Sequence, residues 1–183
     1  EAEPGHNVYL TLDQNLQHLT EALLDGVVGA LARSMTLSGE HEPERVAGVG
    51  ITTGWTTVMG VQPALGRSFD AAEERAGIES GVILVSHRLW ESQFGGRPDL
   101  LGRSIRLDDG SYRVVGVMPP RFRFPYEADV WFPLATDPSD GGSHVLAVFG
   151  RIAPGSDLGQ VERELEFMAG RLQDEHPDTN AGF

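Results

Sequence analysis

The sequence contains no cysteine. A serine with a histidine as its base is therefore the first nucleophilic pair to look for. That absence removes thiol nucleophiles, disulfides and thiolate metal ligands. Ser86 and His87 are adjacent, but neighbouring residues on a helix do not face one another, and no G-x-S-x-G turn surrounds them. We therefore predict that Ser86 caps the helix that follows it, and we assign no catalytic residue.

The histidines do not form a metal-binding pattern. No two of them stand three or four residues apart, which would place two ligands on one side of a helix. His41 with Glu42 and Glu44 is the nearest cluster, and a solvated turn explains it. We expect neither a metal site nor a cofactor. The six histidines are His6, His18, His41, His87, His144 and His176.

The tetrapeptide Leu-Gly-Arg-Ser occurs twice, at Leu65–Ser68 and Leu101–Ser104. Each copy follows an earlier glycine, Gly60 or Gly96, and superficially suggests a phosphate-binding loop. That loop needs four residues between its glycines and a lysine after the second, whereas here there are five residues and an arginine. Each copy is therefore predicted to be a tight turn that leads into a strand.

The acidic residues suggest no particular catalytic pair. Asp108 and Asp109 fall at a hairpin turn, where aspartate bonds to backbone groups. Catalytic carboxylates meet in space rather than in sequence, so a pair remains an open alternative. A solvated helix face explains the acidic residues near the C-terminus. These are Glu162, Glu164, Glu166, Asp174 and Glu175.

The most binding-like segment alternates basic and aromatic residues. Arginine and aromatic side chains are enriched among the residues that dominate the energy of protein interfaces. The segment is a candidate partner surface. The interpretation that the pattern favours is an edge strand with one aromatic face buried. The predicted surface consists of Arg121, Phe122, Arg123, Phe124 and Tyr126.

Strands, helices and turns must position these residues. The sequence patterns that predict such elements are densest between Val82 and Pro120. Val82–Val85 is a β-branched run, and the helix after Ser86 should end at Gly95. Ser104–Leu107 and Tyr112–Val117 alternate and should pair as a hairpin. Apolar spacing predicts helices over Val8–Leu24 and from Leu158 to Pro177. Further strands are predicted at Val27–Leu37, Arg45–Ile51, Ala128–Leu134 and His144–Ile152.

The composition of the chain restricts its function. Its 183 residues are 40% hydrophobic and carry a formal net charge of −13, which argues against nucleic acid and anionic membrane surfaces as partners. No run of eighteen apolar residues occurs. The order of elements predicts an α+β fold. We expect a discontinuous α+β subdomain, residues 1–70 and 140–183, and an inserted β-rich subdomain, residues 71–139.

Several segments in order resemble the periplasmic core domain of MacB-type ABC transporter permeases, and most of all the permease subfamily abundant in acidobacteria. The resemblance covers roughly residues 40 to 183, and the first forty residues match only loosely. The segments are GVQPALGRSF at Gly60–Phe69, LVSHRLWESQFGG at Leu84–Gly96, LLGRSIRLDDGSYRVVGVMPPRFRFP at Leu100–Pro125, DVWFPL at Asp129–Leu134 and RIAPGSDLGQVERELE at Arg151–Glu166.

The resemblance implies a non-catalytic domain on the periplasmic side of the cytoplasmic membrane, inserted between two membrane helices of its permease. The discontinuous subdomain would be the membrane-proximal one. ATP hydrolysis, in a separate domain or subunit, would be coupled to periplasmic movement. Implied partners are the transmembrane part of the permease, the ATP-binding subunit indirectly, and a periplasmic adaptor or substrate protein, with dimerisation only in the full transporter. A stand-alone extracytoplasmic ligand- or protein-binding module is the alternative function.

Overall fold

The computed structural model describes residues 23–39, 42–135 and 146–175. The chain divides into two compact units, unit 1 with residues 1–29 and 136–183, and unit 2 with residues 30–135. Helices and a mixed sheet occur together, which confirms the predicted α+β class. The subdomain boundaries near residues 70 and 140 stay a prediction. Most of the predicted helix Val8–Leu24 lies outside the described residues.

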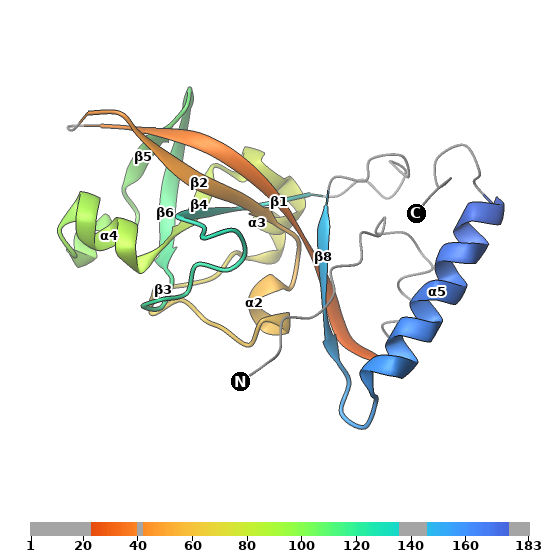
Figure 1. Cartoon of the computed structure of the whole chain (residues 1–183). Helices are drawn as coiled ribbons and strands as arrows, with labels where there is room; N and C mark the ends of the chain where they lie inside the picture. The colour runs from red at the N-terminus through yellow and green to blue at the C-terminus, as the bar shows by residue number, and fades with distance from the viewer. Residues whose placement is uncertain (1–22, 40–41, 136–145, 176–183) are drawn as a thin grey trace. The chain divides into compact units, whose positions relative to one another are not determined.

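Six strands of the sheet form a closed ring. In the order β1, β2, β7, β4, β6 and β5, each strand pairs with the next, and β5 pairs with β1 again. The short β3 pairs with β6 outside the ring. The strands are β1 (Leu24–Ser38), β2 (Glu44–Ile51), β3 (Leu65–Gly66), β4 (Val82–Val85), β5 (Ser104–Leu107), β6 (Gly110–Val117) and β7 (Val130–Pro133) (Figure 1).

The inside of this ring is the core of unit 2. Every strand of the ring contributes buried apolar side chains, and Leu89 and Leu100 from the adjoining helical segments join them. All four residues of β4 are buried, which explains why that segment is an apolar run rather than an alternating one. The ring residues of this core are Met35, Leu37, Val46, Ile83, Val85, Ile105, Leu107, Val114, Val117, Val130 and Phe132.

Capped helices connect the strands of unit 2. The Ser86 hydroxyl accepts a hydrogen bond of 3.1 Å from the Leu89 N–H, so the predicted cap is confirmed. The same helix ends at Gly95, whose φ of 64° suits glycine. The helical segments are α2 (Trp55–Val58), α3 (Ala71–Ala76), η1 (Gly77–Ser80), α4 (His87–Phe94) and η2 (Pro98–Leu100).

A second cap links α3 to the first Leu-Gly-Arg-Ser segment. The Asp70 carboxylate accepts hydrogen bonds from the N–H groups of Ala72 and Glu73, both at 2.9 Å. Arg67 donates to both carboxylate oxygens of Glu73, at 2.6 and 2.7 Å. These hydrogen bonds lower the pKa of Glu73 and raise the pKa of Arg67. Arg67 therefore holds a helix N-terminus through a carboxylate.

The hairpin and the glycine turns follow the sequence pattern closely. β5 and β6 pair antiparallel as expected. The Asp108 carboxylate accepts a hydrogen bond of 2.8 Å from the Thr36 N–H, so it tethers the hairpin to β1 instead of bonding within the turn. The second Leu-Gly-Arg-Ser segment leads into β5, whereas the first forms β3 itself. At Gly66, with a φ of 78°, a Cβ would lie 2.3 Å from the Val115 carbonyl oxygen.

Unit 1 has a small core of its own. β8 (Ala147–Ile152) pairs with β1, and the helix α5 (Leu158–Glu175) follows it. The predicted end of this helix at Pro177 lies outside the described residues. The described acidic side chains Glu162, Glu164, Glu166 and Asp174 are exposed, as expected for a solvated face. This core cluster consists of the buried residues Leu24, Val161 and Met168, with Leu23, Val27 and Leu165 packed against them.

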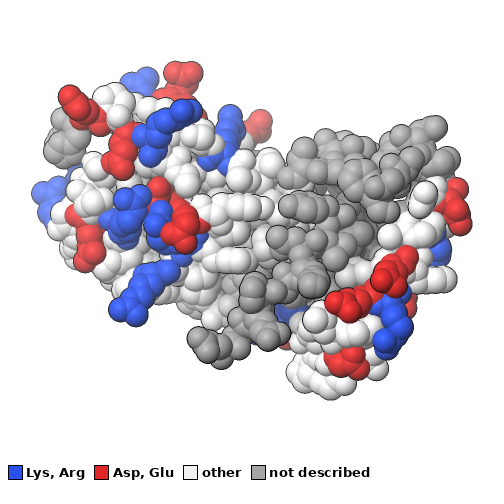
Figure 2. All heavy atoms as spheres, viewed as in Figure 1, with Lys and Arg blue, Asp and Glu red and all other residues white. Residues whose placement is uncertain are grey.

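The negative charge is unevenly distributed along the chain. Eleven of the fourteen arginines and thirteen of the twenty-seven acidic residues lie between residues 30 and 135, so unit 2 carries a formal charge of only −2. On the face of unit 2 in Figure 2, arginines and acidic side chains are interspersed. Within the described segments, no helix combines the length and apolarity needed to cross a bilayer.

Candidate functional site

The predicted partner surface lies on the loop between β6 and β7, and it is not a strand. Residues 120–127 form turns, and Arg121, Tyr126 and Glu127 have φ angles of 69°, 60° and 54°. Residues in the left-handed region cannot continue a β-ladder. The edge-strand interpretation of Arg121–Tyr126 is therefore wrong. We call residues 121–127 the β6–β7 loop.

Arg123 holds the β6–β7 loop in place from within. Its guanidinium lies 2.7 Å from a carboxylate oxygen of Glu127 and donates to the Glu127 carbonyl at 2.7 Å. It also reaches the Asp129 carboxylate at 3.3 Å. The Arg123 side chain is only 29% exposed. Arg123 is therefore an internal anchor of the loop before it is a contact for another molecule.

Asp129 is the buried centre of this anchor. Its side chain is 6% exposed and accepts hydrogen bonds from Arg88 at 2.6 Å and from the Ala47 N–H at 3.2 Å, in addition to the one from Arg123. A buried carboxylate needs such partners because desolvation of an unpaired charge is costly. Residues from β2, α4 and the β6–β7 loop thus converge on one carboxylate.

Aromatic contacts fix the rest of the loop. Phe122 packs against Trp131 with ring centroids 5.8 Å apart, and Phe124 stacks on Trp55 at 6.0 Å. The Trp131 indole N–H donates to the Phe124 carbonyl at 3.1 Å. Figure 1 shows this loop beside α2, where Trp55 begins the helix. The loop is thus held by packing as well as by charge.

The five predicted surface residues divide into two groups. Phe122 and Arg123 are half-buried and support the loop, whereas Arg121, Phe124 and Tyr126 are exposed. Phe124 is 43% exposed and Tyr126 is 50% exposed, so another molecule can reach both residues.

Tyr126 also lines a shallow hollow of about 380 Å³ against β1 and β2. Exposed aromatic groups on a fixed backbone, beside a hollow, form a surface suited to a partner.

Four supporting residues were not identified from the sequence: Asp129, Arg88, Trp55 and Trp131. Asp129 carried a usable signal, since it is a single acidic residue directly before the apolar run Val130–Pro133, and such a carboxylate needs a cation. Arg88 carried none, because it lies 41 residues away from Asp129 in the sequence.

The other candidate groups do not assemble into a reactive site among the described residues. Ser86 is a buried cap, and the Nδ1 atom of His87 lies 3.3 Å from Glu91, one helical turn further on. No three histidine or carboxylate side chains of the described segments gather as metal ligands. The remaining histidines, His6, His18, His41, His144 and His176, lie outside the described residues.

Comparison with protein families identifies the domain. The model of the MacB-like periplasmic core domain matches residues 5–167. The chain therefore belongs to this family, a periplasmic domain of membrane ABC transporters, which confirms the resemblance to the family. The acidobacterial subfamily stays a prediction. The match begins well before residue 40, so it also includes the segment that resembled the family only loosely. No curated protein sequence matches the chain at a significant level.

Solved structures share the fold. The extracellular domain of the noncanonic ABC-type transporter YknZ from Gram-positive bacteria has a TM-score of 0.67 at 19% identity, over 96% of this chain and 87% of that one. The periplasmic region of MacB from Actinobacillus actinomycetemcomitans has a TM-score of 0.68 at 16% identity, over 93% and 77%.

A domain of a putative permease from Porphyromonas gingivalis has a TM-score of 0.66 at 17% identity, over 96% of this chain and 76% of that one. At these identities the three likenesses show the fold alone.

Proposed function

We propose that this domain is the extracytoplasmic coupling part of a MacB-type permease of the acidobacterial type. It lies on the periplasmic side of the cytoplasmic membrane, in the same chain as membrane helices. ATP hydrolysis elsewhere in the transporter moves it, and it passes that movement to a periplasmic adaptor or substrate protein. Family membership supports this proposal.

The observation that carries the partner role is the fixed β6–β7 loop. Arg123 and Phe122 hold its backbone, while Phe124 and Tyr126 are exposed. A loop already fixed in its binding conformation loses little conformational entropy when a partner binds. We therefore assign partner contact to Arg121, Phe124 and Tyr126, and support of the loop to Phe122 and Arg123.

The proposal is tested in the full-length permease with its ATP-binding subunit. We expect the double variant F124A/Y126N to lose most of the co-purifying periplasmic partner, while the free energy of unfolding falls by only about 1 kcal/mol. Asparagine is chosen at 126 because it tolerates a positive φ. The matched control is F167A, which removes an aromatic side chain that is 61% exposed on α5.

Two results would contradict the partner assignment. One is unchanged assembly of F124A/Y126N, and the other is equal loss of assembly in F167A. Unfolding of F124A/Y126N would show instead that the loop is a core element.

The coupling role has its own test. This domain contains no cysteine, so S111C, at an exposed residue of β6 outside the β6–β7 loop, can carry a fluorescent probe in a permease whose other cysteines are replaced. Its signal should change on ATP hydrolysis, and no change would count against coupling.

The alternative function, a stand-alone binding module, makes a different prediction. A gene that encodes this domain without flanking membrane helices, and with no neighbouring ATPase gene, would favour the stand-alone module over the permease.

A further inference from the structure

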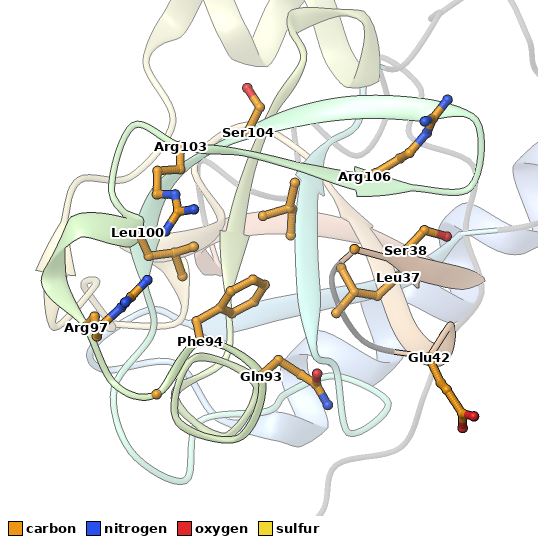
Figure 3. Close-up of a pocket in the computed structure, with 13 residues that line it drawn as sticks. Leu37, Ser38, Glu42, Gln93, Phe94, Arg97, Leu100, Arg103, Ser104 and Arg106 are labelled. Atoms are coloured by element: carbon orange, nitrogen blue, oxygen red, sulfur yellow. The ribbon is translucent and has the colours of Figure 1, made fainter.

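A cavity of about 720 Å³ opens on unit 2 between the end of β1, the C-terminal end of α4, η2 and β5 (Figure 3). It shares no residue with the β6–β7 loop. Its volume lies within the range of small-molecule sites, roughly 300–1,000 Å³. The cavity is therefore large enough to hold a small ligand.

The floor of the cavity is apolar. Leu37, Phe94, Leu100 and Ile105 line it, and all four belong to the core of unit 2 or pack against it. In Figure 3 the Phe94 ring points toward the middle of the cavity from the end of α4. Their positions are fixed by the core, so the apolar floor is present before any ligand arrives. Such a floor suits a hydrocarbon chain or an aryl ring.

One side of the cavity carries two arginines, Arg97 and Arg103, beside Leu100 (Figure 3). Both guanidinium groups share a single carboxylate, Asp99, at 3.4 and 3.7 Å. One carboxylate cannot occupy the five N–H donors that each guanidinium carries. The pair therefore keeps a net positive charge and donors for a second anion.

The backbone of this arginine pair is held rigidly. The indole N–H of Trp90 donates to the Arg97 carbonyl at 2.9 Å, and the Arg103 N–H donates to the Leu100 carbonyl at 3.0 Å. Arg106 and the acidic Glu42 also line the cavity, but in Figure 3 both side chains point away from it. A cationic side next to an apolar floor is complementary to a molecule with one anionic end and one apolar end.

We infer that this cavity binds a small amphiphilic carboxylate, such as a medium-chain fatty-acid anion. The carboxylate pairs with Arg97 and Arg103, and the chain lies over Phe94, Leu37 and Ile105. This inference concerns the isolated chain and does not rest on the proposed function.

The test uses three ten-carbon probes with the 183-residue chain: decanoate, 1-decanol and decylammonium. Calorimetry should show decanoate binding one to one and at least tenfold more tightly than decylammonium, because only the anion pairs with the arginines. The backbone amide signals of Gly95 and Ser104, which line the cavity, should shift in NMR spectra. The amide signal of Ala76 on α3 should not shift.

Variants locate the site. The double variant R97Q/R103Q should bind decanoate at least tenfold more weakly and lose its preference over 1-decanol. The matched control R75Q removes the charge of an exposed arginine on α3 and should bind like the original chain. If the double variant unfolds, R97Q alone replaces it, since the Arg97 side chain is 65% exposed.

Three results would overturn the inference. They are equal affinity for all three probes, a loss of binding in R75Q as large as in R97Q/R103Q, and binding of an acidic apolar peptide in this cavity without binding of decanoate. The last result would assign the cavity to a protein partner.

Discussion

Asp129 gives the sharpest test of how the β6–β7 loop is held, because two arginines from different elements share this one buried carboxylate. Arg88 comes from α4 and Arg123 from the loop itself. A double-mutant cycle with R88A, R123A and R88A/R123A measures the free energy of unfolding that each arginine contributes. It separates this contribution from the destabilisation caused by leaving Asp129 without a cation.

The magnitudes follow from exposure. R88A removes a partner that is 46% exposed, and Asp129 keeps Arg123. We therefore expect R88A to lower the free energy of unfolding by about 1 kcal/mol. R123A also removes the Glu127 contacts, and about 1.5 kcal/mol is expected. The double variant leaves a carboxylate that is 6% exposed with no cation, and about 4 kcal/mol is expected. The expected coupling free energy between Arg88 and Arg123 is therefore about 1.5 kcal/mol.

The assay is urea unfolding at pH 7, followed by tryptophan fluorescence. All three tryptophans, Trp55, Trp90 and Trp131, lie in unit 2, so the signal reports this unit alone. The slope of the free energy against urea concentration should stay constant across the variants.

Substitution D129N in the double variant should recover about 1–2 kcal/mol, because a neutral amide is cheaper to bury than an unpaired carboxylate. The exposed control R75A should change stability by less than about 0.5 kcal/mol. Additive losses within about 0.5 kcal/mol would refute the shared-carboxylate reasoning. So would the absence of any recovery with D129N.

Two further predictions concern the helix caps. S86A should destabilise unit 2 by about 1 kcal/mol in the same urea assay, because the Leu89 N–H loses its acceptor, and a loss no larger than that of the exposed control S111A would contradict this. E73Q should lower the free energy of unfolding by about 1 kcal/mol at pH 7. The expected loss is small because solvent screens the partner Arg67, whose side chain is 47% exposed. Because the folded-state pKa of Glu73 is lowered, its contribution is present above the unfolded-state pKa of about 4.3 and disappears as the pH falls through the folded value. The stabilities of both proteins should therefore converge as the pH falls from about 4.3 through the folded-state pKa of Glu73, and a constant difference down to acid pH would refute the assignment.

Local structure could be predicted from the sequence because its causes are local. The strand Val82–Val85, the cap at Ser86 and the hairpin Ser104–Leu107 with Tyr112–Val117 were all expected, and the structure contains them. A β-branched run, a hydroxyl before an apolar spacing and a turn between two alternating segments each act within a few residues.

Closure of the ring could not be predicted in the same way. β1 must pair with β2 along most of its length and then with β5 at Leu37 and Ser38. β2 must pair in parallel with β7, which lies about eighty residues later. No local pattern records such partners, since any exposed strand edge offers the same N–H and C=O groups. The strands were therefore predictable, but their order was not.

The candidate surface shows the same limit at the level of side chains. Composition selected Arg121–Tyr126 as one stretch, since arginine and aromatics together suggest binding. The structure gives Arg123 a different role from Phe124, because the Arg123 guanidinium contacts a buried carboxylate whereas Phe124 is 43% exposed. That difference depends on Asp129 and Trp55, which only the folded ring brings to the loop.

This division of tasks makes stability and recognition separable. The backbone of Tyr126 has a φ of 60°, a conformation that costs free energy for any residue with a side chain. The loop keeps it because Arg123, Asp129 and the packing of Phe122 on Trp131 hold both sides. Loss of an anchor should therefore release the loop and weaken partner binding indirectly, through a lower population of the binding conformation. Loss of Tyr126 should weaken binding directly and leave the anchor intact. Anchor variants and Tyr126 variants could differ in stability and still weaken binding equally. That result would show that the partner requires the rigid loop itself.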